Sequence, residues 1–189
     1  HAFAVDWSGN VSGDLLLKIN VSARQVNFHR NDGSGGKTST LLAGDGKPAG
    51  FVDSLSRAGY AFKGWYENAE GGGSAVTRDT VFETMPTERV ELYAKWVKTW
   101  QVTLGQRGEG EVQAETVSGA PSPFEEGNDV TVTWQPAPGY RVKGVWLDDV
   151  LLQPDGSGKL TIPTIGADHH VFVEFERENS AEEQVYYSV

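Results

Sequence analysis

The sequence contains the same motif twice, 80 residues apart, and this internal repeat limits the folds that the chain can adopt. The first copy reads GYAFKGWY over residues 59–66, and the second reads GYRVKGVW over residues 139–146. The Gly-Tyr pair, the Lys-Gly pair and the closing aromatic residue coincide without a gap. Repetition at this spacing predicts two small modules of similar construction instead of one large domain.

A second element follows each motif and consists of an acidic residue after a turn, then an alternating apolar segment. It reads ERVELYAKW over residues 88–96 and DHHVFVEF over residues 168–175. A third copy, DLLLKINV, stands at residues 14–21, and no Gly-Tyr motif precedes it. We therefore expect residues 1–24 to be the tail of a truncated upstream module.

Apolar and polar residues alternate through most of the chain, which is the pattern of β-strands. Leu92, Ala94 and Trp96 share one face of such a strand. Only residues 50–58 carry apolar positions at helical spacing and are a candidate for a short helix. The sequence therefore predicts a mainly β protein, α+β at most, built from two small tandem modules.

The module boundaries follow from the repeat. We expect the first module at residues 25–97, the second at residues 100–177 and a C-terminal tail at residues 178–189. The four residues between the two alternating segments, 97–100, are too few for a flexible linker, so one strand is predicted to run almost directly into the next and stiffen the chain.

Both ends of the chain contain strand-like segments with no complete module of their own. These are residues 15–21 and residues 185–189. Because an isolated strand leaves its N–H and C=O groups unpaired, we expect each end to pair with a sheet edge.

The motif of residues 59–66, followed by Leu-Tyr-Ala-x-Trp at residues 92–96, resembles the Listeria–Bacteroides repeat, also called the internalin B-repeat. The second module resembles a divergent relative of the same repeat, through EEGNDVTV at residues 125–132 and PGYRV at residues 138–142. The resemblance implies extracellular, wall-attached proteins with tandem modules, a β-grasp-like first module and an all-β second one. It implies no active site, and it implies roles in spacing an adhesive head from the cell wall or in host contact.

The motif residues expected to shape the two modules are aromatic, apolar or glycine: Gly59, Tyr60, Phe62, Gly64, Trp65, Tyr66, Leu92, Trp96, Gly139, Tyr140, Gly144 and Trp146. Of these, Tyr60, Phe62, Trp65, Leu92 and Trp96 stand where the first module must bury side chains, so we expect them in its core. Four further aromatic residues stand at the joins and are expected to pack between modules: Trp7, Trp100, Tyr186 and Tyr187.

Composition excludes several classes of partner. Asp and Glu number 26 against 16 Lys and Arg, giving a net charge of −10, and no basic block is present. Such a chain does not bind nucleic acid by releasing counterions, and it is repelled by anionic lipid. The apolar runs are too short to insert into a membrane, and the absence of cysteine removes disulfides and thiolate chemistry.

Three segments invite a chemical interpretation. Residues 33–38, GSGGKT, resemble part of a phosphate-binding loop, but Asn31 replaces its first glycine and no helical pattern follows, so a hairpin loop is favoured. Asp148-Asp149 lies between apolar runs, which favours a hairpin turn over a calcium site. His169 and His170 are adjacent and point to opposite faces of a strand, which disfavours a zinc site.

Catalysis and cofactor binding find no support in the sequence. No Gly-x-Ser-x-Gly elbow is present, and the Glu125-Glu126 pair is adjacent instead of lying across a cleft. The leading hypothesis is a non-catalytic stalk or spacer segment of a bacterial cell-surface adhesin, whose partners are neighbouring modules of its own chain. The alternative is a module that binds a host protein or a glycan. Such a binder would show a contiguous apolar or aromatic patch of more than about a few hundred Å², whereas a stalk would expose polar, unpatterned faces.

Overall fold

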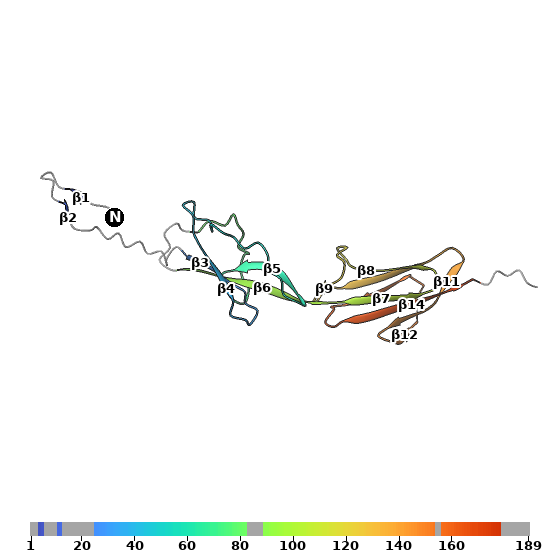
Figure 1. Ribbon diagram of the computed structural model, residues 1–189. Coiled ribbons are helices and arrows are strands. Elements are labelled where there is room, and N and C mark those ends of the chain that lie inside the picture. Colours follow the sequence, from blue (N-terminus) through green and yellow to red (C-terminus); the bar gives the residue numbers. More distant parts are fainter. Residues whose placement is uncertain (1–3, 6–10, 13–24, 83–88, 154–155, 179–189) are drawn as a thin grey trace, which may run out of the picture. The chain divides into compact units, whose positions relative to one another are not determined.

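The computed structural model describes residues 4–5, 11–12, 25–82, 89–153 and 156–178 (Figure 1). These residues contain strands, turns and irregular segments but no helix. The strands are β1 (Ala4–Val5), β2 (Val11–Ser12), β3 (Gln25–His29), β4 (Lys37–Leu41), β5 (Tyr60–Tyr66), β6 (Val90–Trp100), β7 (Val102–Arg107), β8 (Gly110–Thr116), β9 (Phe124–Glu125), β10 (Val130–Pro136), β11 (Tyr140–Leu147), β12 (Val150–Leu152), β13 (Lys159–Ile162) and β14 (His169–Arg177). The prediction of a mainly β chain with tandem modules is confirmed.

The chain divides by its internal contacts into two compact units. The first comprises His1–Leu55 and Phe62–Lys95, and the second comprises Ser56–Ala61 and Trp96–Val189. The division therefore falls inside β5 and β6. At the N-terminus, β1 and β2 pair antiparallel. The segments 15–21 and 185–189, for which edge pairing is predicted, lie outside the described residues, as do Trp7, Tyr186 and Tyr187.

In the first module the sheet order is β4-β3-β6-β5. Strand β3 is antiparallel to β4 and parallel to β6, with Phe28 opposite Leu92. The inner face is apolar and almost fully buried through Val26, Phe28, Trp65, Leu92 and Ala94. Their burial follows the alternation read from the sequence, because residues two apart in a strand share a face.

Residues 50–58 form no helix, and the expectation of a short one is wrong. Their backbone groups are used by tertiary hydrogen bonds in place of helical ones. The carbonyl of Val52 accepts from the Trp65 indole N–H, and the N–H of Gly50 donates to the Thr40 hydroxyl. Phe51 still packs edge-on against Phe28, at 5.5 Å between ring centroids. Apolar residues at helical spacing were therefore not sufficient to predict a helix here. The β-grasp likeness of this module stays a prediction.

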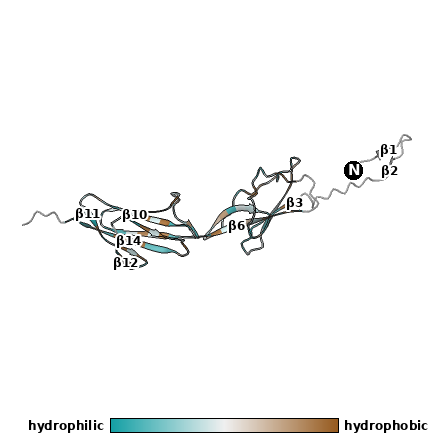
Figure 2. Ribbon diagram, turned by 180° about the vertical axis from the view of Figure 1, so that it is seen from behind, coloured by the Kyte–Doolittle hydropathy of each residue, from teal (hydrophilic) through white to brown (hydrophobic). Residues whose placement is uncertain are grey.

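The second module has two sheets, ordered β13-β10-β8 and β12-β11-β14-β7. One apolar cluster joins them: Val102, Phe124, Val130, Val132, Trp134, Val145, Ile162, Ile165, Val171, Val173 and Phe175. Along β10 the apolar residues are buried and the intervening threonines are half-buried, as the alternation predicts. Figure 2 shows hydrophobic and hydrophilic positions along the strands of both modules.

Both modules contain the same three-strand arrangement, which gives the sequence repeat a structural meaning. The first strand of each module, β3 or β7, runs parallel to the closing strand, β6 or β14. The closing strand in turn neighbours the strand that carries the Gly-Tyr motif, β5 or β11. The modules differ in their remaining strands, because β4 joins the main sheet whereas β8, β10 and β13 form a second one.

Candidate functional site

The Gly-Tyr pair of each motif forms a tight turn. Gly59 and Gly139 have φ values of 74° and 79°, which L-residues with a side chain rarely adopt. The turns are closed by hydrogen bonds of 3.1 Å from the Tyr60 N–H to the Arg57 carbonyl and of 2.9 Å from the Tyr140 N–H to the Ala137 carbonyl. A glycine at the third position of such a turn is typical of type II geometry.

Each turn also receives the end of its closing strand. The Gly59 carbonyl accepts from the Thr99 N–H at 2.8 Å, and the Gly139 carbonyl accepts from the Glu178 N–H at 2.9 Å. A guanidinium lies over the motif tyrosine in both modules, Arg57 at 3.7 Å from the Tyr60 ring centroid and Arg177 at 5.7 Å from that of Tyr140. The motif therefore fixes where the last strand of each repeat ends.

The second glycine of each motif lies beneath the aromatic residue two positions later. A Cβ added to Gly144 would lie 2.5 Å from the Trp146 ring, and one added to Gly64 would lie 3.8 Å from the Tyr66 ring. The strand register shifts between Val142 and Gly144, which marks a bulge. Gly64 has a φ of 117°, so the first motif is distorted at the same point.

The distortion at Gly64 changes which side chains share a face. Phe62 contacts Trp65, whose ring packs on Phe28 in the core at 4.9 Å. Tyr66 instead lies against the Lys95 ammonium at 5.2 Å. Phe62 and Tyr66 are four positions apart and would share a face in a regular strand. They contact different parts of the module because the backbone is distorted at Gly64 between them.

The expected core aromatics are buried to different degrees. Trp65 and Leu92 are 1% and 0% exposed. Tyr60, Phe62 and Trp96 are half-buried. Trp65 thus meets the expectation of burial and Trp96 meets it only in part, since Trp96 lies beyond the buried part of β6 and has the Arg57 guanidinium 5.9 Å above its ring.

The residues that link the two repeats are hydrogen-bonded one after another, all within the second unit. Thr99 and Trp100 at the end of β6 pair antiparallel with β9. The Lys98 carbonyl accepts from the Glu126 N–H at 2.8 Å. The Gln101 N–H donates to the Asp168 carboxylate at 2.8 Å, and its carbonyl accepts from the His169 N–H at 2.9 Å. Trp100 packs against the core of the second module.

The sequence of the chain matches two protein-family models that cover these two modules. Residues 25–95 match the Listeria-Bacteroides repeat domain, and residues 101–179 match the Divergent InlB B-repeat domain. The chain is a tandem pair of B-repeat domains. Both families occur in bacterial surface proteins, and no catalytic family matches. No curated protein and no solved structure matches the chain.

Within the B-repeat pair, residues 33–36 of the glycine-rich segment lie in the hairpin loop between β3 and β4, and Lys37 and Thr38 begin β4. The Arg30 N–H donates to the Gly36 carbonyl at 2.8 Å and closes the loop. Hydrogen bonds from Ser34 and Arg30 hold the pKa of Asp32 well below its ordinary value, so the loop carries its own anion. The hairpin interpretation is confirmed, and the Arg30 guanidinium is paired with the Asp32 carboxylate at 2.9 Å.

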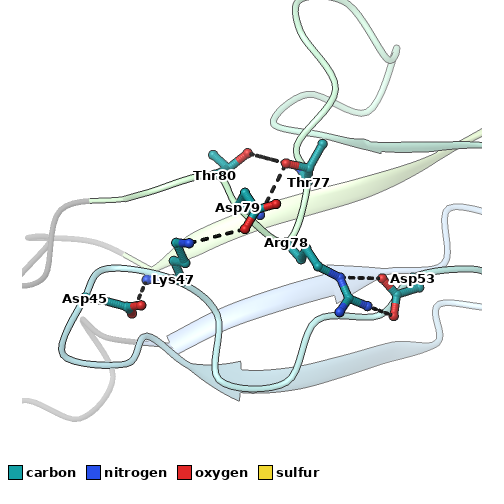
Figure 3. Close-up of polar contacts among 7 residues, drawn as sticks. All are labelled: Asp45, Lys47, Asp53, Thr77, Arg78, Asp79 and Thr80. Atoms are coloured by element: carbon teal, nitrogen blue, oxygen red, sulfur yellow. Dashed lines mark hydrogen bonds and ion pairs between the residues drawn. The ribbon is translucent and has the colours of Figure 1, made fainter.

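The loops of the first B-repeat are tied together by polar contacts that the sequence analysis did not single out (Figure 3). Arg78 binds the Asp53 carboxylate through two nitrogen atoms, and the Lys47 ammonium lies 3.2 Å from Asp79. Gly46 passes so close to Phe82 that an added Cβ would lie 2.3 Å from the Phe82 carbonyl oxygen. No sequence signal reveals these pairs, because they join loops that are about 25–35 residues apart.

Among the described residues, no group of three or more His, Asp or Glu side chains is placed to hold a metal ion. The same residues include no helix long and apolar enough to cross a membrane.

Asp148 and Asp149 form the two-residue turn between β11 and β12, as the sequence predicts. Their φ values are 49° and 65°, the left-handed values of a type I′ turn. We expect Asp149→Gly to raise the free energy of unfolding of the second module by about 0.5–1 kcal/mol, because glycine adopts this conformation without strain. Urea titration measures the change, and a lower midpoint would contradict the turn assignment.

Asp148 makes the stability of the second module depend on pH. Its carboxylate accepts the His170 N–H at 2.8 Å and pairs with the His169 ring at 2.7 Å. The His170 hydrogen bond, then the His169 one, lowers the pKa of Asp148. Because the folded-state pKa lies below the unfolded one, the stabilisation is present above about pH 4 and is lost as pH falls through the folded value.

We therefore expect the unfolding midpoint of Asp148→Asn to fall less than that of the wild type between neutral pH and about pH 3. Asp149→Asn, which alters the neighbouring carboxylate of the same turn, is the matched control and should keep the wild-type profile. Equal profiles for Asp148→Asn and the wild type would refute this role of Asp148.

Proposed function

We propose that the B-repeat pair is a stalk segment of a cell-wall-attached bacterial adhesin and holds an adhesive head away from the cell surface. The observation that carries the proposal is the link at residues 97–101. Its backbone groups are held by β9, by the Gly59 turn and by Asp168, all within one compact unit. A segment held in this way has few free dihedral angles and resists bending more than a flexible linker does.

The construction of the modules also supports a mechanical role. Each has its own apolar core, in the first module around Trp65 and Phe28 and in the second between two sheets. The charged side chains along β11 and β14 are paired across strands, with Arg141 2.6 Å from Glu176 and Lys143 3.1 Å from Glu174. Neither module depends on a disulfide, since the chain has no cysteine.

A display experiment tests the proposal. A binding head of known target is anchored to a bacterial surface through the B-repeat pair, through a Gly/Ser linker of equal residue number, or directly. We expect the pair to give the highest capture of bulky target particles, because folded modules keep their bulk between the head and the surface, whereas a flexible chain also samples conformations that bring the head down to the surface. Capture no better than with the Gly/Ser linker would contradict a stalk role.

A further inference from the structure

The outer face of the β12-β11-β14-β7 sheet carries an apolar row that the stalk role does not use. In strand register, Leu151 lies opposite Trp146, Trp146 opposite Phe172, and Phe172 opposite Gly105. Leu151 is 54% exposed. Trp146 and Phe172 are half-buried, although their neighbours Val145 and Val173 are wholly buried on the inner face. The row therefore crosses the sheet on its solvent side.

Each of the two rings of this row packs closely against a glycine residue. A Cβ added to Gly144 would lie 2.5–3.2 Å from three atoms of the Trp146 ring, and one added to Gly105 would lie 2.8 Å from the Phe172 ring. The ring centroids are 5.7 Å apart, with planes at 62°. Rings at this angle do not form one flat surface, so the half-buried Trp146 ring, which approaches Gly144 with three of its atoms, is the ring on which a ligand can stack.

The first B-repeat has aromatic residues at the corresponding places, but its own side chains contact them. Tyr66, the counterpart of Trp146, has the Lys95 ammonium at 5.2 Å, and that ammonium donates to the Gly71 carbonyl at 3.0 Å. Tyr93, the counterpart of Phe172 in the closing strand, is stacked on His29 at 4.8 Å. Among the described residues, Trp146 has no such cation and no stacked ring, and its ring contact is the edge of Phe172.

The surroundings of the row decide what kind of partner fits it. On one side lie the Glu174 carboxylate with Lys143 at 3.1 Å and Arg107 at 3.8 Å, followed by the pair of Arg141 and Glu176. These groups offer both hydrogen-bond donors and acceptors beside the rings. Their charges largely cancel, so a strongly charged ligand has no advantage.

A protein partner fits this face poorly. A stable protein interface buries about 800 Å² on each partner, and three apolar side chains, two of them half-buried, supply only a small part of that area. An apolar protein surface would also have to desolvate the flanking ion pairs, which is costly. A sugar ring has an apolar face of C–H groups for the aromatic rings and hydroxyls that satisfy both donors and acceptors at its edge.

We infer that this face, formed by Trp146, Phe172 and Leu151, is a binding site for the pyranose rings of a neutral glycan. The sugar stacks on Trp146, and its hydroxyls bond to the Lys143–Glu174 pair. A glycan site would give this segment a ligand in addition to its proposed role as a spacer. The inference does not depend on the spacer role.

The test is a titration of the whole ¹⁵N-labelled chain with cellotriose, maltotriose and chitotriose in turn, followed by two-dimensional NMR. We expect at least one of them to shift the Trp146 indole signal and the amides of β11, β12 and β14, with a Kd of about 1 mM, as few stacking contacts allow. Trp146→Ala should weaken sugar binding at least tenfold. Trp146→Tyr, which keeps an aromatic ring, should weaken it less.

Tyr66→Ala, at the covered counterpart in the first B-repeat, is the matched control and should leave Kd unchanged. If Trp146→Ala unfolds the second module, Lys143→Ala and Leu151→Ser are used in its place. Each is expected to weaken sugar binding at least threefold. The proposal is overturned when none of the three sugars shifts these signals, when the shifts fall on the first B-repeat, or when the face responds only to a protein.

Discussion

Replacing Trp65 by alanine is expected to lower the free energy of unfolding of the first B-repeat by about 3–5 kcal/mol, as for other large buried aromatics. Its side chain is 1% exposed and contacts Phe28 and Phe62 at ring-centroid distances of 4.9 and 5.4 Å. Its indole N–H also donates to the Val52 carbonyl, so truncation removes both packing and a hydrogen bond to the irregular segment 50–58.

Urea unfolding followed by the amide signals of each module separates the two transitions. The signals of β10 and β14 should keep their midpoint in Trp65→Ala, because the second module has its own core. Trp96→Ala is the comparison within β6 and should cost less, since Trp96 is half-buried. A loss below about 1 kcal/mol for Trp65→Ala would show that this tryptophan is not a core residue.

Gly108→Ala is expected to destabilise the second B-repeat by about 3 kcal/mol. Gly108 follows β7 with a φ of 83°, a conformation that costs a residue with a side chain about 1–2 kcal/mol. In addition, an added Cβ would lie 2.2 Å from the Phe175 carbonyl oxygen, which belongs to a paired strand and cannot move freely. Overpacking of this kind adds about 1–3 kcal/mol.

Gly127 provides a control with the same backbone conformation and free space. Its φ is 85°, and an added Cβ would meet nothing within 4 Å. Gly127→Ala should therefore cost only the conformational part, about 1–2 kcal/mol. Equal losses in the two variants, measured by chemical denaturation, would show that the close approach of Gly108 to Phe175 is not what makes alanine unfavourable.

The features that the sequence predicts are those encoded by residues near one another in the chain. Gly59 and Gly139 mark turns because residues with a side chain rarely adopt their φ values, whereas glycine does so without strain. The alternation of Val130, Val132 and Trp134 predicts the buried face of β10, because side chains in a strand alternate between faces. The Asp148-Asp149 turn follows from the apolar runs on either side of it.

The features that the sequence did not predict depend on contacts between distant segments. Residues 50–58 have helical spacing, yet hydrogen bonds from Trp65 and to Thr40 hold them in an irregular path. The pairing of β9 with the end of β6 joins Thr99 to Glu125 and Trp100 to Phe124, which are 26 and 24 positions apart, and it leaves no local signal. The row of Trp146, Phe172 and Leu151 requires the register of three strands, which no single strand encodes.

Hydrogen exchange at the link tests the central claim most directly, namely that the two B-repeats are joined by folded structure. The amides of Thr99, Gln101 and Glu126 donate to the Gly59 carbonyl, the Asp168 carboxylate and the Lys98 carbonyl. We predict that these amides exchange as slowly as those of β10 within the second module, because they open only when that module opens. Exchange at the rate of an unstructured peptide would contradict the claim and leave the link a flexible tether.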